Sequence, residues 1–185
     1  MGSAGSNVKS RITFIAYSAV WIACGVLLPL LFHCFGLGKA FLPMHLPVIA
    51  GGMLMGWQYG LVIGMLTPLI SSFLTGMPPL APPVAPAMMV ELSLAGALAG
   101  ACYRPLGNHV YAALIITLIS ARLIWGLMGY FMLPLLGLKG IGILYPLTAG
   151  LLSSLPGIAL QIILIPPLVY GLERTGVNKF SQNSA

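Results

Sequence analysis

Two charged side chains stand inside otherwise apolar stretches, and they are the residues of this chain best suited to binding chemistry. Glu91 lies in the apolar segment 87–103, and Arg122 lies in the segment 110–133. A charge placed in hydrocarbon is costly, so such residues face a protein interior or a wet cavity and pair with another group. Two interpretations remain open: a structural pair between these two residues, or polar anchors for a ligand that an arginine can hold through two N–H donors.

Four further residues are candidates for the same site. Trp125 follows Arg122 by three positions and shares its helical face, and Tyr130 lies near the end of that segment; their rings suit a flat heterocycle or an aromatic belt at the interface. His45 could donate to a ligand or cap the chain at the start of its apolar stretch. Gln161 needs a partner in a dry environment. For it we favour an interhelical hydrogen bond, with ligand binding as the alternative.

The composition requires a scaffold that is embedded in a membrane. The chain of 185 residues has 5% charged and 59% hydrophobic residues, whereas soluble domains have roughly 25% charged residues. At about 20 residues per span, this length allows six crossings. The net charge of +6 comes from eight basic and two acidic residues. The basic residues are scattered singly, so the sequence shows no stripe for binding nucleic acid.

Hydrophobic segments and breaker residues predict an all-α integral membrane protein with six transmembrane helices. A segment at 41–74 is too long for one crossing, and we expect a tight hairpin at 56–59 (Gly-Trp-Gln-Tyr) that leaves the second helix unusually short. The five prolines of 76–86 predict a stiff loop. The expected division is an N-terminal tail at 1–11, a six-helix domain at 12–173 and a C-terminal tail at 174–185, with the other helices at 12–35, 87–103, 110–133 and 147–172.

The distribution of lysine and arginine predicts that both termini are cytoplasmic. With that orientation the outer side holds only two basic residues, Lys39 and Lys139, and the inner side holds the other five named here: Lys9, Arg11, Arg104, Arg174 and Lys179. The outer connections are then the Lys39 turn, the proline-rich loop and the Lys139 loop, with Tyr145 close by. We expect a captured molecule to enter there.

Small residues recur every fourth position, which lets helix backbones approach closely. The series are Ala19 with Ala23, Gly96 with Gly100, and Gly52, Gly56, Gly60 and Gly64. Packing within the chain is the simplest interpretation of the glycines.

Enzyme motifs are missing from the sequence. It contains no HExxH, no GxSxG, no Walker A sequence and no aspartate at all, which argues against protease, hydrolase and ATPase chemistry in this chain. We expect no cofactor and no metal site, and we interpret Cys24, Cys34 and Cys102 as packing thiols.

Three segments resemble a known family, the substrate-binding S components of energy-coupling factor vitamin transporters. They are Phe-Leu-Pro-Met-His-Leu-Pro at 41–47, the glycine-spaced hairpin, and Leu-Thr-Gly-Met-Pro-Pro at 74–79. The resemblance implies capture of a vitamin at the outer face of a bacterial plasma membrane, docking onto a transmembrane scaffold subunit, and energy from two partner ATPase subunits. It also implies that Ala19 and Ala23 match the AxxxA docking pattern on the first helix.

The substrate class remains open at the level of sequence. Arg122 and Glu91 could serve a carboxylate such as pantothenate, or a polar heterocycle such as pyridoxine or hydroxymethylpyrimidine, and we rank these above riboflavin and folate. The alternative function is a secondary carrier that works alone and is coupled to protons, with Glu91 as a proton relay. Such a carrier would be expected to show an internal inverted repeat, and none is visible.

Overall fold

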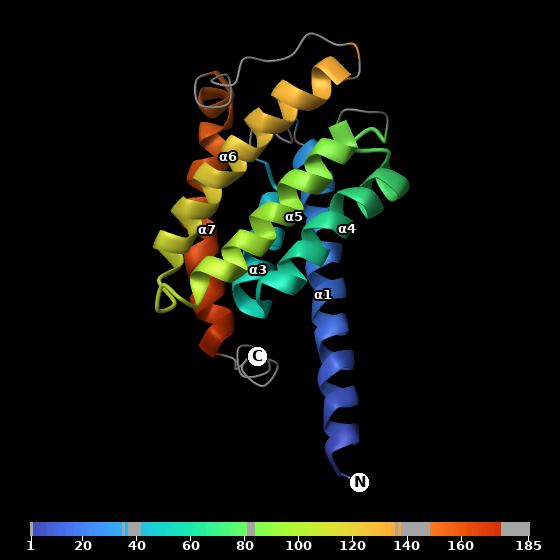
Figure 1. The fold of residues 1–185 in the computed structure, drawn as a ribbon, viewed down its shortest axis with the longest axis vertical. Coiled ribbons are helices and arrows are strands. Elements are labelled where there is room, and N and C mark those ends of the chain that lie inside the picture. The colour runs from blue at the N-terminus through green and yellow to red at the C-terminus, as the bar shows by residue number, and fades with distance from the viewer. Residues whose placement is uncertain are drawn as a thin grey trace.

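The computed structural model describes residues 2–34, 36, 42–80, 84–135, 137 and 149–174. Within these residues the chain forms six helices and no strand, which confirms the prediction of an all-α membrane protein (Figure 1). The helices are α1 (Gly2–Cys34), α3 (His45–Met55), α4 (Trp57–Thr75), α5 (Val84–Tyr103), α6 (Val110–Leu135) and α7 (Ala149–Arg174).

Five of these helices contain an apolar stretch long enough to cross a bilayer. The stretches have 19 to 23 residues, and the first begins at Ile12 within α1. Helix α3 has only 11 residues, which is about 16 Å at 1.5 Å per residue and about half of a hydrocarbon core. The expectation of an unusually short second helix is therefore confirmed.

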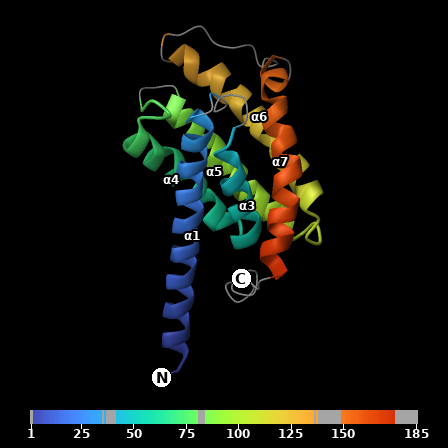
Figure 2. The same ribbon diagram turned by 180° about the vertical axis from the view of Figure 1, so that it is seen from behind.

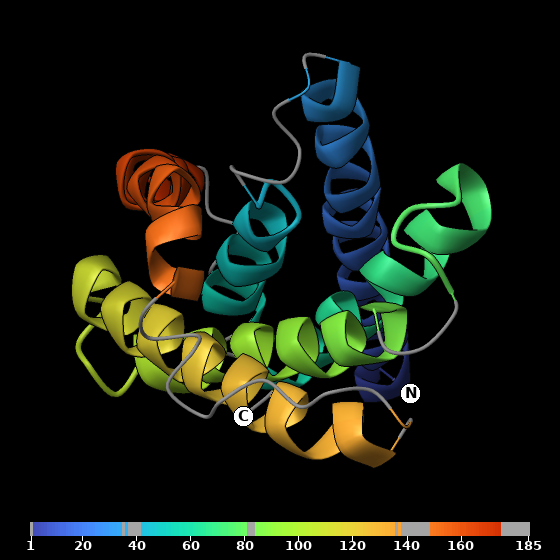
Figure 3. The ribbon, with the colours of Figure 1, turned by 90° about the horizontal axis from the view of Figure 1, so that it is seen from above.

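The short helix α3 stands in the middle of the bundle. Viewed from above, it lies among α1, α4, α5 and α7 (Figure 3), and it contacts all four. Each of its 11 residues is buried. A helix that is apolar on every side is stable only where neighbours surround it, so α3 forms the core against which the longer helices pack.

The break between α3 and α4 falls at Gly56, the first residue of the hairpin predicted at 56–59, and α4 already begins at Trp57, so the predicted turn is three residues too long. Gly56 has φ 96° and ψ 169°, and its N–H donates to the carbonyl of Gly52 to close α3. A side chain is strongly disfavoured at such a φ, whereas glycine adopts it readily. One residue is thus enough to turn the chain from α3 into α4.

Glycines allow α5 to pack directly on the backbones of α3 and α4. A Cβ atom added to Gly60 or Gly52 would collide with the carbonyl oxygen of Gly96, and one added to Gly96 would collide with that of Gly60. Gly64 and Gly100 lie equally close to neighbouring backbone. The glycine spacing therefore serves packing within the chain.

The proline-rich loop is shorter than the sequence predicts. Helix α5 begins at Val84 and includes Pro86 in its first turn, so the expectation of a loop through residue 86 is wrong for its last three residues. The first N–H groups of a helix have no partner within the helix, which is why proline is tolerated there.

Hydroxyl groups hold the start of this loop against α4. Ser71 donates to the carbonyl of Met77, and Ser72 donates to the carbonyl of Pro78, each at 2.6 Å. Gly76 ends α4 with φ 71°, the left-handed conformation common just beyond a helix. The C-terminal end of α4 is thereby fixed to the connection that follows it.

The first and last described helices place their terminal ends on the same side of the bundle. The start of α1, the turn between α5 and α6, and the end of α7 lie at the lower side of Figure 1. Arg104 in that turn and Arg174 at the end of α7 share this side. Helix α1 begins at Gly2, so it includes most of the expected tail at 1–11 and extends below the other helices (Figure 2). The expected positions of Lys39, Lys139, Tyr145 and Lys179 lie outside the described residues.

Candidate functional site

Each of four neighbouring helices carries a buried polar side chain: His45 on α3, Glu91 on α5, Arg122 on α6 and Gln161 on α7. Counted from the helix ends at the lower side of Figure 1, all four lie 10 to 13 residues along their helices. This corresponds to about 15–20 Å. The four side chains therefore occupy a similar depth, and we call this set the polar level.

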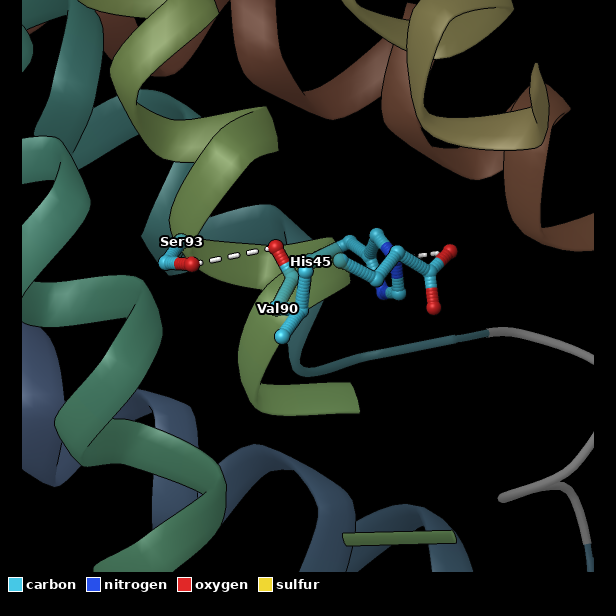
Figure 4. Close-up of polar contacts among 4 residues, drawn as sticks. His45, Val90 and Ser93 are labelled. Carbon is cyan, nitrogen blue, oxygen red and sulfur yellow. Dashed lines mark hydrogen bonds and ion pairs between the residues drawn. The ribbon is translucent and has the colours of Figure 1, made fainter. Parts of the chain in front are cut away.

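His45 and Glu91 are in direct contact at the polar level. His45 Nε2 lies 3.4 Å from Glu91 Oε1 (Figure 4), and both side chains are buried. A carboxylate only accepts hydrogen bonds, so the hydrogen is assigned to Nε2. In the neutral imidazole, Nδ1 is then an acceptor, and it has no partner in the described part of the chain. The nearby hydroxyl of Ser93 donates to the carbonyl of Val90 on its own helix (Figure 4) and does not join this contact.

Arg122 is buried at the same level of the bundle but is not paired with His45 or Glu91 in the described chain. Its residue exposure is 9%, and its Nε–H has no hydrogen-bond acceptor among the described residues. The carboxyl group of Glu91 makes its contact with His45 instead. At least one donor of Arg122, its Nε–H, therefore remains available.

Gln161 is the most completely buried polar side chain of the four. Its exposure is 0%, and neither Nε2 nor Oε1 has a hydrogen-bond partner in the described residues. The interhelical hydrogen bond favoured from the sequence is thus not formed there. Burying an amide without partners costs a few kcal/mol, so a group that satisfies both atoms would bind with a clear advantage.

One comparison with known proteins is positive. The profile of a family described as "ECF transporter, substrate-specific component" matches residues 13–169. The chain belongs to this family. No curated protein and no solved structure shows significant similarity to it. The resemblance inferred from sequence is confirmed: the chain is a multi-pass S component that binds a small molecule and works with a transmembrane T component and ATPases, and it is not itself an enzyme.

The aromatic candidates of the S component lie apart from one another. Trp125 is partly buried one turn beyond Arg122. Tyr130 lies about 7.5 Å beyond Trp125 along α6 by helical rise. It is 48% exposed, and its ring packs edge-on against Phe131 with the ring centroids 5.1 Å apart. The structure therefore keeps Trp125 near the polar level and places Tyr130 at the surface of the bundle.

Ala19 and Ala23 lie on the surface of α1. Both are exposed, and they line a shallow groove of about 420 Å³ whose opposite wall is formed by Ile70 and Leu74 of α4. The groove is apolar. At Ala19 and Ala23 only methyl groups project from α1, and such small residues allow a neighbouring helix to approach closely.

A larger groove is lined by residues of α1, α3 and α7. Its volume is about 630 Å³, and its apolar and aromatic side chains include Trp21, Leu46 and Leu168. None of the candidate substrate residues lines it. Its composition matches a surface that lies against lipid or a partner helix.

The contact between His45 and Glu91 is the functional feature that sequence reasoning missed. The two residues are 46 positions apart, and each was considered alone. Counting residues from the helix ends at the lower side of Figure 1 places His45 and Glu91 at a similar depth. Among the described residues, no group of three or more His, Cys, Asp or Glu side chains could hold a metal ion.

Proposed function

We propose that this S component captures a small B-type vitamin or vitamin precursor of the pantothenate, pyridoxine or hydroxymethylpyrimidine class from the outer side of a bacterial plasma membrane. The observation that carries the proposal is the set of unpartnered buried atoms at the polar level. They are Arg122 Nε, which donates, the ring nitrogen His45 Nδ1, and both amide atoms of Gln161. A polar molecule with donors and acceptors of its own satisfies them.

The orientation follows from the basic residues at one end of the bundle. Arg104 and Arg174 lie at the same end as the start of α1, and the positive-inside tendency assigns this end to the cytoplasm. The polar level is then about 15–20 Å above the cytoplasmic end, which leaves the outer half of a bilayer of about 30 Å above it. A substrate reaches it from outside, past the end of α4 and the start of α5.

The side chains have distinct roles in this proposal. Arg122 donates to a carbonyl, hydroxyl or carboxylate oxygen of the substrate, and Trp125 offers a flat apolar surface one turn away. Glu91 holds His45 by the 3.4 Å contact and so fixes which imidazole nitrogen faces away from it. Tyr130, being exposed, contributes at most at the rim.

The partner subunits attach elsewhere. Ala19 and Ala23 are exposed on α1 beside an apolar groove, which suits close packing against a helix of the T component. The two ATPase subunits supply the energy, and no nucleic acid is involved. Substrate capture and subunit docking thus use different surfaces of the protein.

The test is to identify small molecules released from the purified protein by mass spectrometry, followed by thermal stabilisation with each released compound. We expect a B-type vitamin or precursor that raises the melting temperature, because a ligand that binds only the folded state stabilises it by mass action. Release of no small molecule, together with no stabilisation by any compound of the three classes, would refute the proposal. Uptake by the chain alone in liposomes, driven by a proton gradient, would instead identify a secondary carrier.

A further inference from the structure

Gln161 combines complete burial with two unsatisfied atoms of opposite hydrogen-bonding character. Its carboxamide carries the donor Nε2 and the acceptor Oε1 side by side in one plane, and both are without a partner in the described chain at 0% exposure. Two parallel hydrogen bonds to this group need an acceptor and a donor on adjacent positions of the bound molecule. An amino group beside a ring nitrogen, or a lactam N–H beside its carbonyl, has this arrangement.

We infer that Gln161 is the residue that selects the substrate of this S component, by pairing with an adjacent donor and acceptor on the edge of an uncharged ring. The inference rests on the proposed function and narrows it. An amide can turn by 180° about its last bond, so it pairs with either order of donor and acceptor. It cannot pair with an edge that lacks the donor.

The charges at the polar level favour an uncharged substrate. The polar level holds one acidic side chain, Glu91, and one guanidinium, Arg122, and the carboxyl group of Glu91 already contacts His45 at 3.4 Å. A carboxylate would add an uncompensated negative charge to a buried site, and burying such a charge is unfavourable. An aminopyrimidine adds none, so it fits this site better than pantothenate does.

A structural role for Gln161 predicts the opposite behaviour on mutation. A glutamine that bridges helices stabilises the empty protein, and its removal lowers the melting temperature. Gln161 has no described partner, so replacing it with methionine removes an unsatisfied polar group of similar length. We expect the empty Gln161→Met protein to melt at the same temperature as the unchanged protein or higher.

The decisive experiment is a calorimetric titration of the full-length protein with two probes that differ only at the edge. One is hydroxymethylpyrimidine, which carries an amino group beside a ring nitrogen, and the other is its dimethylamino analogue, which has lost the donor. The protein is expected to prefer the first by about 10- to 100-fold, the value of one or two hydrogen bonds in a dry site. Gln161→Met should bind the two equally, and the preference should persist in the control Ile163→Leu, which changes a 67% exposed side chain of the same helix.

Each result decides the inference. The inference is wrong if the unchanged protein and Gln161→Met prefer the amino probe over the dimethylamino probe to the same degree. It is also wrong if Gln161→Met without ligand melts at a lower temperature while its binding is unaltered. If the unchanged protein binds pantothenate or pyridoxine but neither pyrimidine probe, this inference fails and the proposed function stands. If it binds none of these compounds and releases no small molecule, both fail.

Discussion

Replacing Gly60 with alanine tests the close packing of α4 on α5. The new Cβ would meet the carbonyl group of Gly96, and it would also lie 2.9 Å from the Cα of Gly52. These obstacles are backbone atoms, which cannot move aside as the end of a flexible side chain does. The two helices must therefore separate or shift along each other.

The size of the effect follows from two opposing contributions. Alanine is more favourable than glycine in a helix by about 1 kcal/mol. Overpacking of a dense core costs about 1–3 kcal/mol. The new methyl group would contact backbone of both α5 and α3, so we expect a cost at the upper end of this range. The net loss is about 2 kcal/mol of unfolding free energy, or about 4–8 °C in melting temperature for a chain of this length.

The assay is thermal unfolding of the purified protein in detergent, with Gly171→Ala as the matched control. Gly171 is also helical, and a Cβ added there meets nothing within 4 Å, so the control should melt at the same temperature or slightly higher. If Gly60→Ala and Gly171→Ala shift the melting temperature alike, then the backbone contact between α4 and α5 does not limit this packing.

Three further predictions concern the site and the partner surface. Arg122→Ala should leave the protein folded but weaken substrate binding by about 10- to 100-fold, since hydrogen bonds to charged groups contribute about 1.5–3 kcal/mol; unchanged affinity by calorimetry would exclude this role. Glu91→Ala should destabilise the fold by about 2 kcal/mol because it leaves the buried Nε2 of His45 without its partner. The double variant with His45→Ala should lose less than the sum of the two single variants, whereas strict additivity in denaturation would disprove the coupling. Ala19→Trp should prevent co-purification with the T component while substrate binding persists. The control Leu31→Trp, at another exposed position of α1, should assemble normally. If Ala19→Trp still assembles with the T component, the surface around Ala19 is not the docking surface.

Much of the helical architecture could be predicted from the sequence because the membrane imposes simple constraints. Every backbone N–H and C=O group in hydrocarbon must be bonded internally, so apolar segments of sufficient length become helices. Gly56 marks the break between α3 and α4 because a turn of one residue needs its positive φ. The sequence places the start of α5 too late because the prolines of 76–86 disfavour a helix, whereas the first turn of a helix tolerates proline and α5 begins at Val84.

The candidate site was only partly predictable. Polar residues that stand alone in apolar segments are recognised from the sequence, and Glu91, Arg122 and Gln161 are of this kind. Which of them pair depends on rotation and tilt of the helices, and hydropathy contains neither. The contact of His45 with Glu91, and the lack of any described partner for Gln161, are therefore results of the structure alone.

The shortness of α3 has a consequence for how the chain is built into the membrane. An 11-residue helix is too short to act as an independent membrane anchor, and it is surrounded by α1, α4, α5 and α7, two of which are synthesised well after it. During translation α3 is connected to α4 through Gly56, but it cannot complete its packing until α7, the last of these neighbours, has been synthesised. Deleting α7 would thus leave the most enclosed helix of the protein open to lipid along one side, and quality-control proteases should recognise such a truncated chain.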